Sequence, residues 1–289
     1  MKKIKRSPDD IRLDMHVHTS FSPDSTNDIF RSVGIALGKG LSGFAVCDHG
    51  KAVSSDALRE MMKEQGAEEK YGVVINPKEP CADAFYLIGG CEIAFGGAHV
   101  TGLFLDRTED LSSKNYGSFE EICSFIRSAG GIAVIAHPFE HRRPGEEPPE
   151  DLLCAADGIE SFNSRADYKY PTANERAASL AKEKGCFACA GSDAHFPPEI
   201  GRASVSVSSA DGKYPSFEEL KRLFLAGGRI SSQTRSERRR HAQSAAVRRI
   251  RQKKPLKALR SLVLYVLLFA KDVFYPVGKT NEQEKKENE

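Results

Sequence analysis

The sequence has no arrangement of cysteines that predicts a disulfide framework or a thiolate metal site. Its seven cysteines are scattered along 289 residues, and their number is odd. Cys186 and Cys189 form a C-x-x-C pair, but they lie in GCFACAGSD, which has the composition of a β-strand. Residues three apart on a strand point to opposite faces, so we do not expect a shared zinc ion or a redox pair. Scattered thiols favour a reducing, cytoplasmic location.

Long apolar segments are also missing. The chain starts with MKKIKRSPDD, which runs into charge without an apolar h-region, so we expect no secretory signal. The continuously apolar run at 262–270 has nine residues, whereas a bilayer core needs about 20. The composition, with 40% hydrophobic residues, is otherwise ordinary for a globular protein and predicts a packed core. We expect a cytoplasmic protein that is either free or peripheral to a membrane.

The charge of the chain is divided unevenly between a body and a tail. Residues 229–289 contain 16 Lys and Arg against six Asp and Glu, a net charge of +10, so residues 1–228 carry −8. A chain of this length can form one large α/β domain with an appendage. We therefore expect a folded domain at 10–228 and a basic, partly apolar helical extension at 229–289.

Short apolar segments rich in β-forming residues alternate with helical patterns in the body. IRLDMHVH, LSGFAVCDH and GIESFN predict strands, whereas DIFRSVGIALGKG and SFEEICSFIRSAGG predict helices that end at glycine. About seven strand–helix units fit before residue 230. This alternation predicts an α/β fold with a parallel sheet, open or closed into a barrel.

Histidines and carboxylates stand where the predicted strands end. His16 and His18 alternate along one strand, so both imidazoles project to the same side, as two ligands of one metal ion would. Any one of these histidines could equally be a buried core residue. Their recurrence at successive strand ends favours a metal site, because functional groups gather at the carboxyl ends of strands in α/β folds. The residues at these junctions are His16, His18, Asp48, His49, Glu92, His99, His137, Asp193 and His195.

Four ordered segments, DMHVHTSFSPD, AVCDHG, AVIAHPF and AGSDAHFPPEIG, resemble the motifs of the PHP family, the polymerase and histidinol phosphatase superfamily. GGCEIAF followed by HVTGLF resembles the stretch that supplies its bridging glutamate and a further histidine. The resemblance covers residues 13 to about 205. It implies a distorted (β/α)7 barrel that binds two to three divalent metal ions. Nitrogen and carboxylate ligands without thiolates suit Zn, Mn or Fe.

The resemblance also implies three groups of metal ligands. The first ion would be held by His16, His18, Glu92 and Asp193. Glu92 would bridge to a second ion, which is shared with His99 and His137. The third ion would be held by Asp24, His49 and His195. Asp14 and Asp48 match the motifs but are expected to orient ligating histidines.

The activity that the resemblance implies is hydrolysis of a phosphate ester by metal-activated water, with Glu92, Asp193 and His195 as catalytic residues. The expected substrate is a phosphorylated small molecule, most simply a nucleotide, or a short oligonucleotide. Histidinol-phosphate phosphatase is the alternative. Arg165 and Arg202 follow predicted strand ends and are candidate phosphate ligands, although surface salt bridges are at least as common a role for such arginines.

The tail offers a different class of function. Residues 229–254 are dense in arginine and precede an apolar segment. Residues 229–275 could bind nucleic acid through its phosphates, lie on an anionic membrane as an interfacial helix, or dock on the barrel or a partner. In the alternative hypothesis this tail is the functional part, and the protein is a non-catalytic docking protein with the barrel as its scaffold. The sequence indicates no particular oligomeric state.

Overall fold

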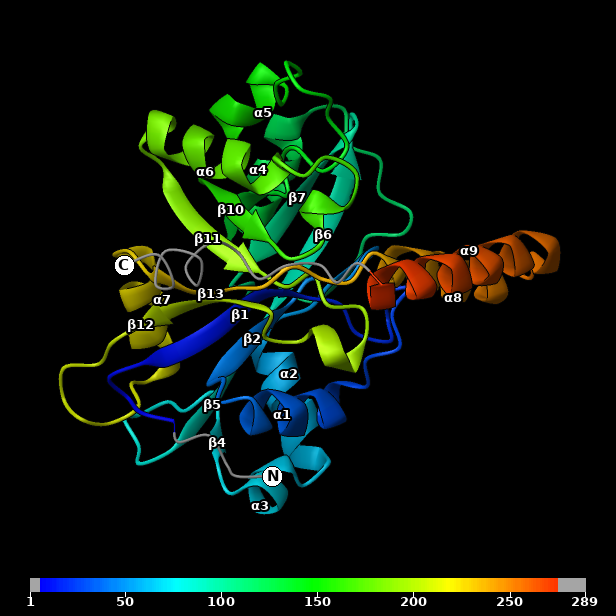
Figure 1. The fold of residues 1–289 in the computed structure, drawn as a ribbon. Helices are drawn as coiled ribbons and strands as arrows, with labels where there is room; N and C mark the ends of the chain where they lie inside the picture. Colours follow the sequence, from blue (N-terminus) through cyan, green and yellow to red (C-terminus); the bar gives the residue numbers. More distant parts are fainter. Residues whose placement is uncertain (1–5, 275–289) are drawn as a thin grey trace, which may run out of the picture.

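A computed structural model of the chain describes residues 6–274 as a mixed α/β fold built on two main sheets (Figure 1). The six-stranded sheet has the order β13-β12-β1-β2-β5-β4. Its strands are β1 (Ile11–Val17), β2 (Gly43–Val46), β4 (Val74–Ile75), β5 (Ala84–Ile88), β12 (Ala203–Val207) and β13 (Arg229–Gln233). The five-stranded sheet has the order β11-β10-β9-β7-β6. Its strands are β6 (Gly90–Phe95), β7 (Ala98–Leu103), β9 (Ile132–Ala136), β10 (Gly158–Asn163) and β11 (Phe187–Gly191).

Helices cover the outer face of each sheet (Figure 1). The six-stranded sheet is covered by α1 (Ile29–Gly38), α2 (Ser55–Glu64) and α3 (Ala67–Tyr71). The five-stranded sheet is covered by α4 (Phe119–Ser128), α5 (Glu150–Ala155) and α6 (Ala173–Lys184). A third buried cluster is shared, since it joins residues such as Leu13 and Val205 of one sheet to Val134 and Phe162 of the other, and includes Phe224 of α7 (Phe217–Leu225). The two sheets therefore enclose a common apolar core.

The two sheets meet at isolated bridges beside the ends of β1, β2 and β6. Val17 pairs with Ala194 after β11, and His49 pairs with Glu92. The backbone N–H of His18 donates to Ala194 O at 2.9 Å. Gly191 allows this approach, because a Cβ there would clash with the Cβ of His16. The predicted α/β class is thus confirmed. The hydrogen-bonded strands form two separate sheets, so the closed barrel stays a prediction.

Several strand pairs run antiparallel, which the alternation of strands and helices did not predict. β6 and β7 form a hairpin, β7 also pairs antiparallel with β9, and β12 pairs antiparallel with β1 and β13. A two-stranded ribbon of β3 (Lys51–Ala52) and β8 (Glu109–Asp110) is antiparallel as well. All seven cysteines are free thiols, in line with the expectation of no disulfide framework.

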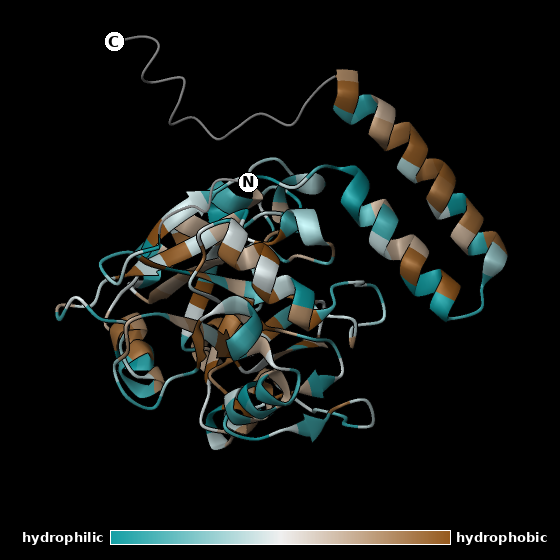
Figure 2. Cartoon of the chain, turned by 90° about the horizontal axis from the view of Figure 1, so that it is seen from below, coloured by the Kyte–Doolittle hydropathy of each residue, from teal (hydrophilic) through white to brown (hydrophobic). Residues whose placement is uncertain are grey.

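The basic tail begins inside the body. β13 belongs to the six-stranded sheet, so the sheet continues beyond the expected domain end at residue 228. It is followed by a helical hairpin of α8 (Arg239–Arg251) and α9 (Pro255–Phe274), which projects from the body (Figures 1 and 2). Residues 275–289 of the expected extension lie outside the described residues. Between residues 6 and 274, no helix combines the length and the apolar character that crossing a membrane requires.

Candidate metal centre

β1 and the residue that directly follows it supply two histidines to one side of the shared interior. The two-residue period of a strand places His16 and His18 on the same face, with their Nε2 atoms 3.2 Å apart. Asp193, two residues after β11, brings its Oδ1 to 3.2 Å from His18 Nε2 and 3.9 Å from His16 Nε2. Its φ of 53° is unusual for a residue with a side chain, so the tertiary structure holds the backbone there. Imidazoles and a carboxylate this close form a ligand set for one cation.

Glu92 of β6 lies at the centre of the cluster. Its Oε1 is 2.9 Å from His99 Nδ1 and 3.0 Å from His137 Nε2. Its Oε2 is 3.1 Å from His49 Nδ1 and 3.4 Å from His18 Nε2. One carboxylate thus touches imidazoles from four segments of the chain, the position that a bridging ligand requires.

The β6–β7 hairpin explains the short spacing between Glu92 and His99. Ala94 pairs with His99 across the hairpin, and Glu92 lies two residues before Ala94 on the same face. The turn uses Gly96 and Gly97, whose φ angles of 54° and 75° suit a two-residue hairpin. A seven-residue separation therefore becomes a diagonal contact between neighbouring strands.

Asp24, His49 and His195 form the third group expected from the sequence. Asp24 Oδ1 lies 3.5 Å from His195 Nε2 and 4.0 Å from His49 Nε2. This oxygen is buried and has no hydrogen-bond partner. A buried carboxylate oxygen without a partner is costly, and a cation between these groups would satisfy it. The donors present therefore fit a divalent metal such as Zn, Mn or Fe.

Burial and the surrounding charges perturb the titration of the cluster. Burial raises the pKa of Glu92 and Asp193, but the neighbouring imidazoles outweigh it and keep both pKa values well below the usual range. Burial lowers the pKa of His137, but Glu140 and Glu92 outweigh it and raise the pKa to about 10. Burial, with the charges of His195 and His49, lowers the pKa of His18 to about 3. Such divergent values within one cluster are typical of functional sites.

Two carboxylates that sequence reasoning missed lie against imidazoles of the cluster. Glu160 Oε1 lies 3.1 Å from His16 Nδ1, and Oε2 accepts the backbone N–H of His137 at 2.8 Å. Glu140 Oε2 lies 3.2 Å from His137 Nδ1. Partners on Nδ1 leave Nε2 free for the centre of the cluster. A charged residue inside the apolar strand GIESFN was the signal that could have identified Glu160, whereas Glu140 had no such signal.

Asp48 acts on His18 through a serine. Its carboxylate accepts from Thr19 N at 2.7 Å, Thr19 Oγ1 at 2.6 Å and Ser22 Oγ at 2.6 Å. Ser22 Oγ in turn lies 3.0 Å from His18 Nδ1. The structure therefore places Asp48 behind the ligands, where it can orient them.

Asp14 contacts backbone amides and the Ser192 hydroxyl rather than an imidazole. It accepts from Ser192 N at 2.8 Å, Gly201 N at 2.7 Å and, more weakly, His16 N at 3.3 Å. Burial outweighs these hydrogen bonds and raises the pKa of Asp14 to about 6. Asp14 thus connects β1 to the segment after β11 by hydrogen bonds. It does not contact a histidine ring directly, as an orienting residue was expected to do.

The two candidate phosphate ligands are engaged in ion pairs. Arg165 is 4% exposed and donates from Nε and Nη2 to the Glu199 carboxylate at 2.8 and 2.7 Å. Glu199 Oε2 also accepts the backbone N–H of His195 at 3.2 Å, so the pair supports that ligand's loop. Arg202 pairs with Glu237 at 2.6 Å. Neither arginine lines the cavity beside the cluster, and their role in substrate binding stays a prediction.

A cavity of about 550 Å³ opens beside the metal-ligand cluster. Asp24, His49, Glu92 and His99 reach it from the cluster. Its other walls include the apolar and aromatic side chains Ile93, Phe95 and Tyr116, and the cationic side chains Lys114 and Arg248. Sequence reasoning missed Arg248, because nothing local relates the basic tail to this cavity. The volume lies within the range of sites for small ligands.

A family model described as PHP-associated matches residues 171–227, which include Asp193 and His195. This match supports the resemblance of the chain to the PHP superfamily. The chain is 28% identical, over 214 residues, to an uncharacterized protein of Methanocaldococcus jannaschii, a match that covers 71% of the chain and 74% of that protein.

Solved structures share the fold of this chain. A two-domain protein of Bacteroides vulgatus that contains a predicted PHP-like metal-dependent phosphoesterase superposes with a TM-score of 0.55 at 20% identity, covering 80% of this chain and 68% of that one. PsfC of Pseudomonas syringae superposes with a TM-score of 0.51 at 16% identity, covering 84% and 99%. At these identities the likeness concerns the fold.

Proposed function

We propose that the protein is a metal-dependent phosphoesterase. The observation that supports this proposal is the convergence of imidazoles and carboxylates from separate strand ends around Glu92, beside a cavity of ligand size. We also propose that the two sheets, which meet beside this cluster, correspond to the distorted (β/α)7 barrel.

Bound Zn, Mn or Fe ions would supply an activated water and stabilise charge on the phosphoryl group. The chain's part is to hold two to three such ions, with the three groups of ligands expected from the sequence. Glu92, Asp193 and His195 are the proposed catalytic residues, since Glu92 joins two groups and the segment after β11 closes the other side. His195 Nδ1 donates to Asp193 O at 2.9 Å, which leaves Nε2 facing Asp24.

The proposed substrates are nucleotides or short oligonucleotides. Phe95 and Tyr116 give the cavity an aromatic wall that a base could stack on, and residues of the metal-ligand cluster also line the cavity. Histidinol phosphate is the alternative, because its imidazole could use the same wall.

The test is hydrolysis by the metal-loaded protein of a panel containing a 3′,5′-bisphosphonucleotide, a short oligoribonucleotide and histidinol phosphate. We expect the nucleotide substrates to be turned over faster than histidinol phosphate. His16→Ala should lose the activity, because it removes a ligand of the cluster. Equal residual activity in this variant would reject the site.

We further propose that α9 docks on an anionic lipid surface, with the protein in the cytoplasm. Ten of its apolar side chains are 43% to 83% exposed, an unusually large apolar surface for one helix (Figure 2). They are Leu256, Leu259, Leu262, Val263, Leu264, Val266, Leu267, Phe269, Val273 and Phe274. Lys253, Lys254, Lys257 and Arg260 surround the hairpin turn. A second copy would bring like charges together, and nucleic acid would leave the apolar side chains in water, so an anionic bilayer fits both features.

The test is sedimentation with vesicles of phosphatidylcholine, with or without phosphatidylglycerol. We expect the chain to pellet with the anionic vesicles and Leu267→Glu to weaken this pelleting. Leu225→Glu, at an exposed site on α7 of the body, is the matched control and should pellet like the original chain. Pelleting that nuclease abolishes, or a dimer without vesicle binding, would contradict the proposal.

A further inference from the structure

Helix α8 of the basic tail is fastened to the body beside the metal-ligand cluster. At one end, Arg251 Nη1 donates to Ser22 O at 2.6 Å, in the loop after β1. Towards the other end, Ser244 Oγ accepts from Arg165 at 3.0 Å, and the His241 ring stacks on Tyr168 with centroids 4.2 Å apart. The helix therefore joins the loops that follow β1 and β10.

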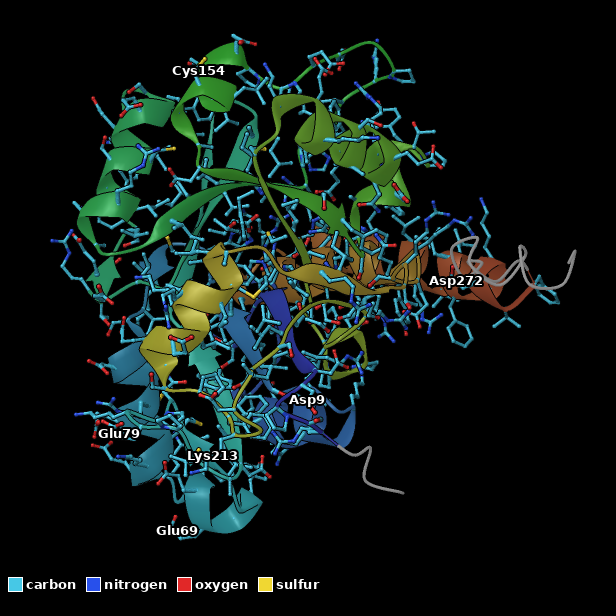
Figure 3. All side chains as sticks on the ribbon, turned by 90° about the vertical axis from the view of Figure 1, so that its left-hand side faces the viewer. Asp9, Glu69, Glu79, Cys154, Lys213 and Asp272 are labelled. Atoms are coloured by element: carbon cyan, nitrogen blue, oxygen red, sulfur yellow. The ribbon has the colours of Figure 1, made fainter. Side chains whose placement is uncertain are left out.

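The two helices of the hairpin are also tied together at the body. Arg239 Nη1, at the start of α8, lies 3.2 Å from Asp272 Oδ2, near the end of α9 (Figure 3). Asp272 is 7% exposed, so this pair is shielded from water. These contacts fix α8 in place and with it the side chains that face the cluster.

Arg248 lies between the two attachment points. It follows Ser244 by one helical turn and precedes Arg251 by three residues, so the three side chains share one face of α8. Its Nη1 is 3.8 Å from Asp24 Oδ2, and its side chain lines the cavity. The side chain is 50% exposed, so its remaining donors are open to a ligand.

The cavity offers one other cation among the described residues that line it. Lys114 Nζ is 2.6 Å from Glu109 Oε1 and lies over the Phe125 ring. Its charge is therefore already compensated. Among the described residues, the ion pairs of Arg248 comprise only the long contact with Asp24, whose other oxygen points toward His195 and His49.

We propose that Arg248 forms a phosphate-binding subsite at the edge of the cavity, so that the basic tail completes the active site. The guanidinium presents a planar set of donors that matches two oxygens of a phosphate monoester or of a nucleotide's terminal phosphate. The inference rests on the proposed function. It makes Arg248 a substrate-positioning residue and names a terminal phosphate as the group recognised.

The test compares Arg248→Ala and Arg248→Lys with Arg222→Ala, an exposed arginine on α7 outside the cavity. Calorimetry would measure inorganic phosphate binding to the metal-loaded proteins, and elemental analysis would measure their metal content. We expect Arg248→Ala to weaken phosphate binding by about 10- to 100-fold, as for a lost charge-assisted hydrogen bond. Arg248→Lys should recover part of that loss, and Arg222→Ala should bind like the original chain. KM for phosphomonoesters should rise in parallel.

The outcomes separate this inference from the proposed function. Phosphate binding and hydrolysis that persist unchanged in Arg248→Ala would overturn the inference and leave the phosphoesterase standing. Loss of metal from Arg248→Ala would overturn it as well, because Arg248 would then act by holding Asp24. A metal-loaded original chain that binds phosphate but hydrolyses no ester would refute the phosphoesterase, with the phosphate subsite still measurable.

Discussion

Replacing Arg165 with methionine distinguishes a structural role from phosphate binding. The guanidinium makes two hydrogen bonds to Glu199 and one to Ser244, and Glu199 is fully buried. Burial raises the pKa of Glu199, but Arg165 outweighs it and holds the pKa below its usual value. Arg165→Met would therefore leave a buried carboxylate without its counterion.

Removing one partner of a buried pair costs about 3–5 kcal/mol, and we expect this loss from the free energy of unfolding. The total free energy of unfolding of a typical domain is about 5–15 kcal/mol, so the variant would lose a large fraction of its stability. Since the pKa of Glu199 is depressed in the folded chain, the contribution of the pair is present above pH 4.5 and is lost as the pH falls through the folded pKa. The difference between the two proteins should therefore shrink in acid.

Urea denaturation of the metal-loaded proteins, followed by circular dichroism, measures this difference. Adding Glu199→Gln to Arg165→Met should restore part of the stability, because a neutral amide needs no counterion and its oxygen still accepts the N–H of His195. The reasoning would be refuted if Arg165→Met unfolded within about 1 kcal/mol of the original chain while binding inorganic phosphate at least tenfold more weakly. That result would make Arg165 a phosphate ligand.

Three further predictions concern the metal-ligand cluster. Glu160→Gln should weaken metal affinity about 10- to 100-fold, as measured by competition with a chelator, because it weakens the hydrogen bond to His16 Nδ1; unchanged affinity would contradict its orienting role. Complete removal of metal should lower the free energy of unfolding by about 4 kcal/mol, compared with the protein in a free metal concentration of 1,000 times Kd. An unchanged Tm after chelation would argue against metal binding. The pKa of His137 is raised to about 10, so metal binding at pH 7 should release the proton of this imidazole. Metal affinity should therefore increase as the pH rises to 10. Calorimetry in buffers of different ionisation enthalpy would detect the released proton. The raised pKa also means that protonated His137 stabilises the metal-free fold. This contribution is fully present below pH 6.5 and is lost as the pH rises through 10.

Local periodicity accounts for what the sequence by itself determined. The alternation of short β-rich segments with amphipathic helices predicts the α/β class, because each pattern follows from the repeat of its own element. The strand repeat places His16 and His18 on one side without knowledge of any other segment. Functional groups at strand ends, together with the resemblance to the PHP motifs, named histidines and carboxylates that the structure places in one cluster.

Only the tertiary structure decided which charges remain available at the site. Arg165 and Arg248 are both arginines near a carboxylate, yet one is enclosed in an ion pair and the other opens into the cavity. Glu160 looked like part of an apolar strand until packing placed it behind His16. These outcomes depend on which segments pack together across the whole chain, and no local repeat contains that information. The composition of the tail showed that it is basic, but only its packing brought Arg248 to the metal-ligand cluster.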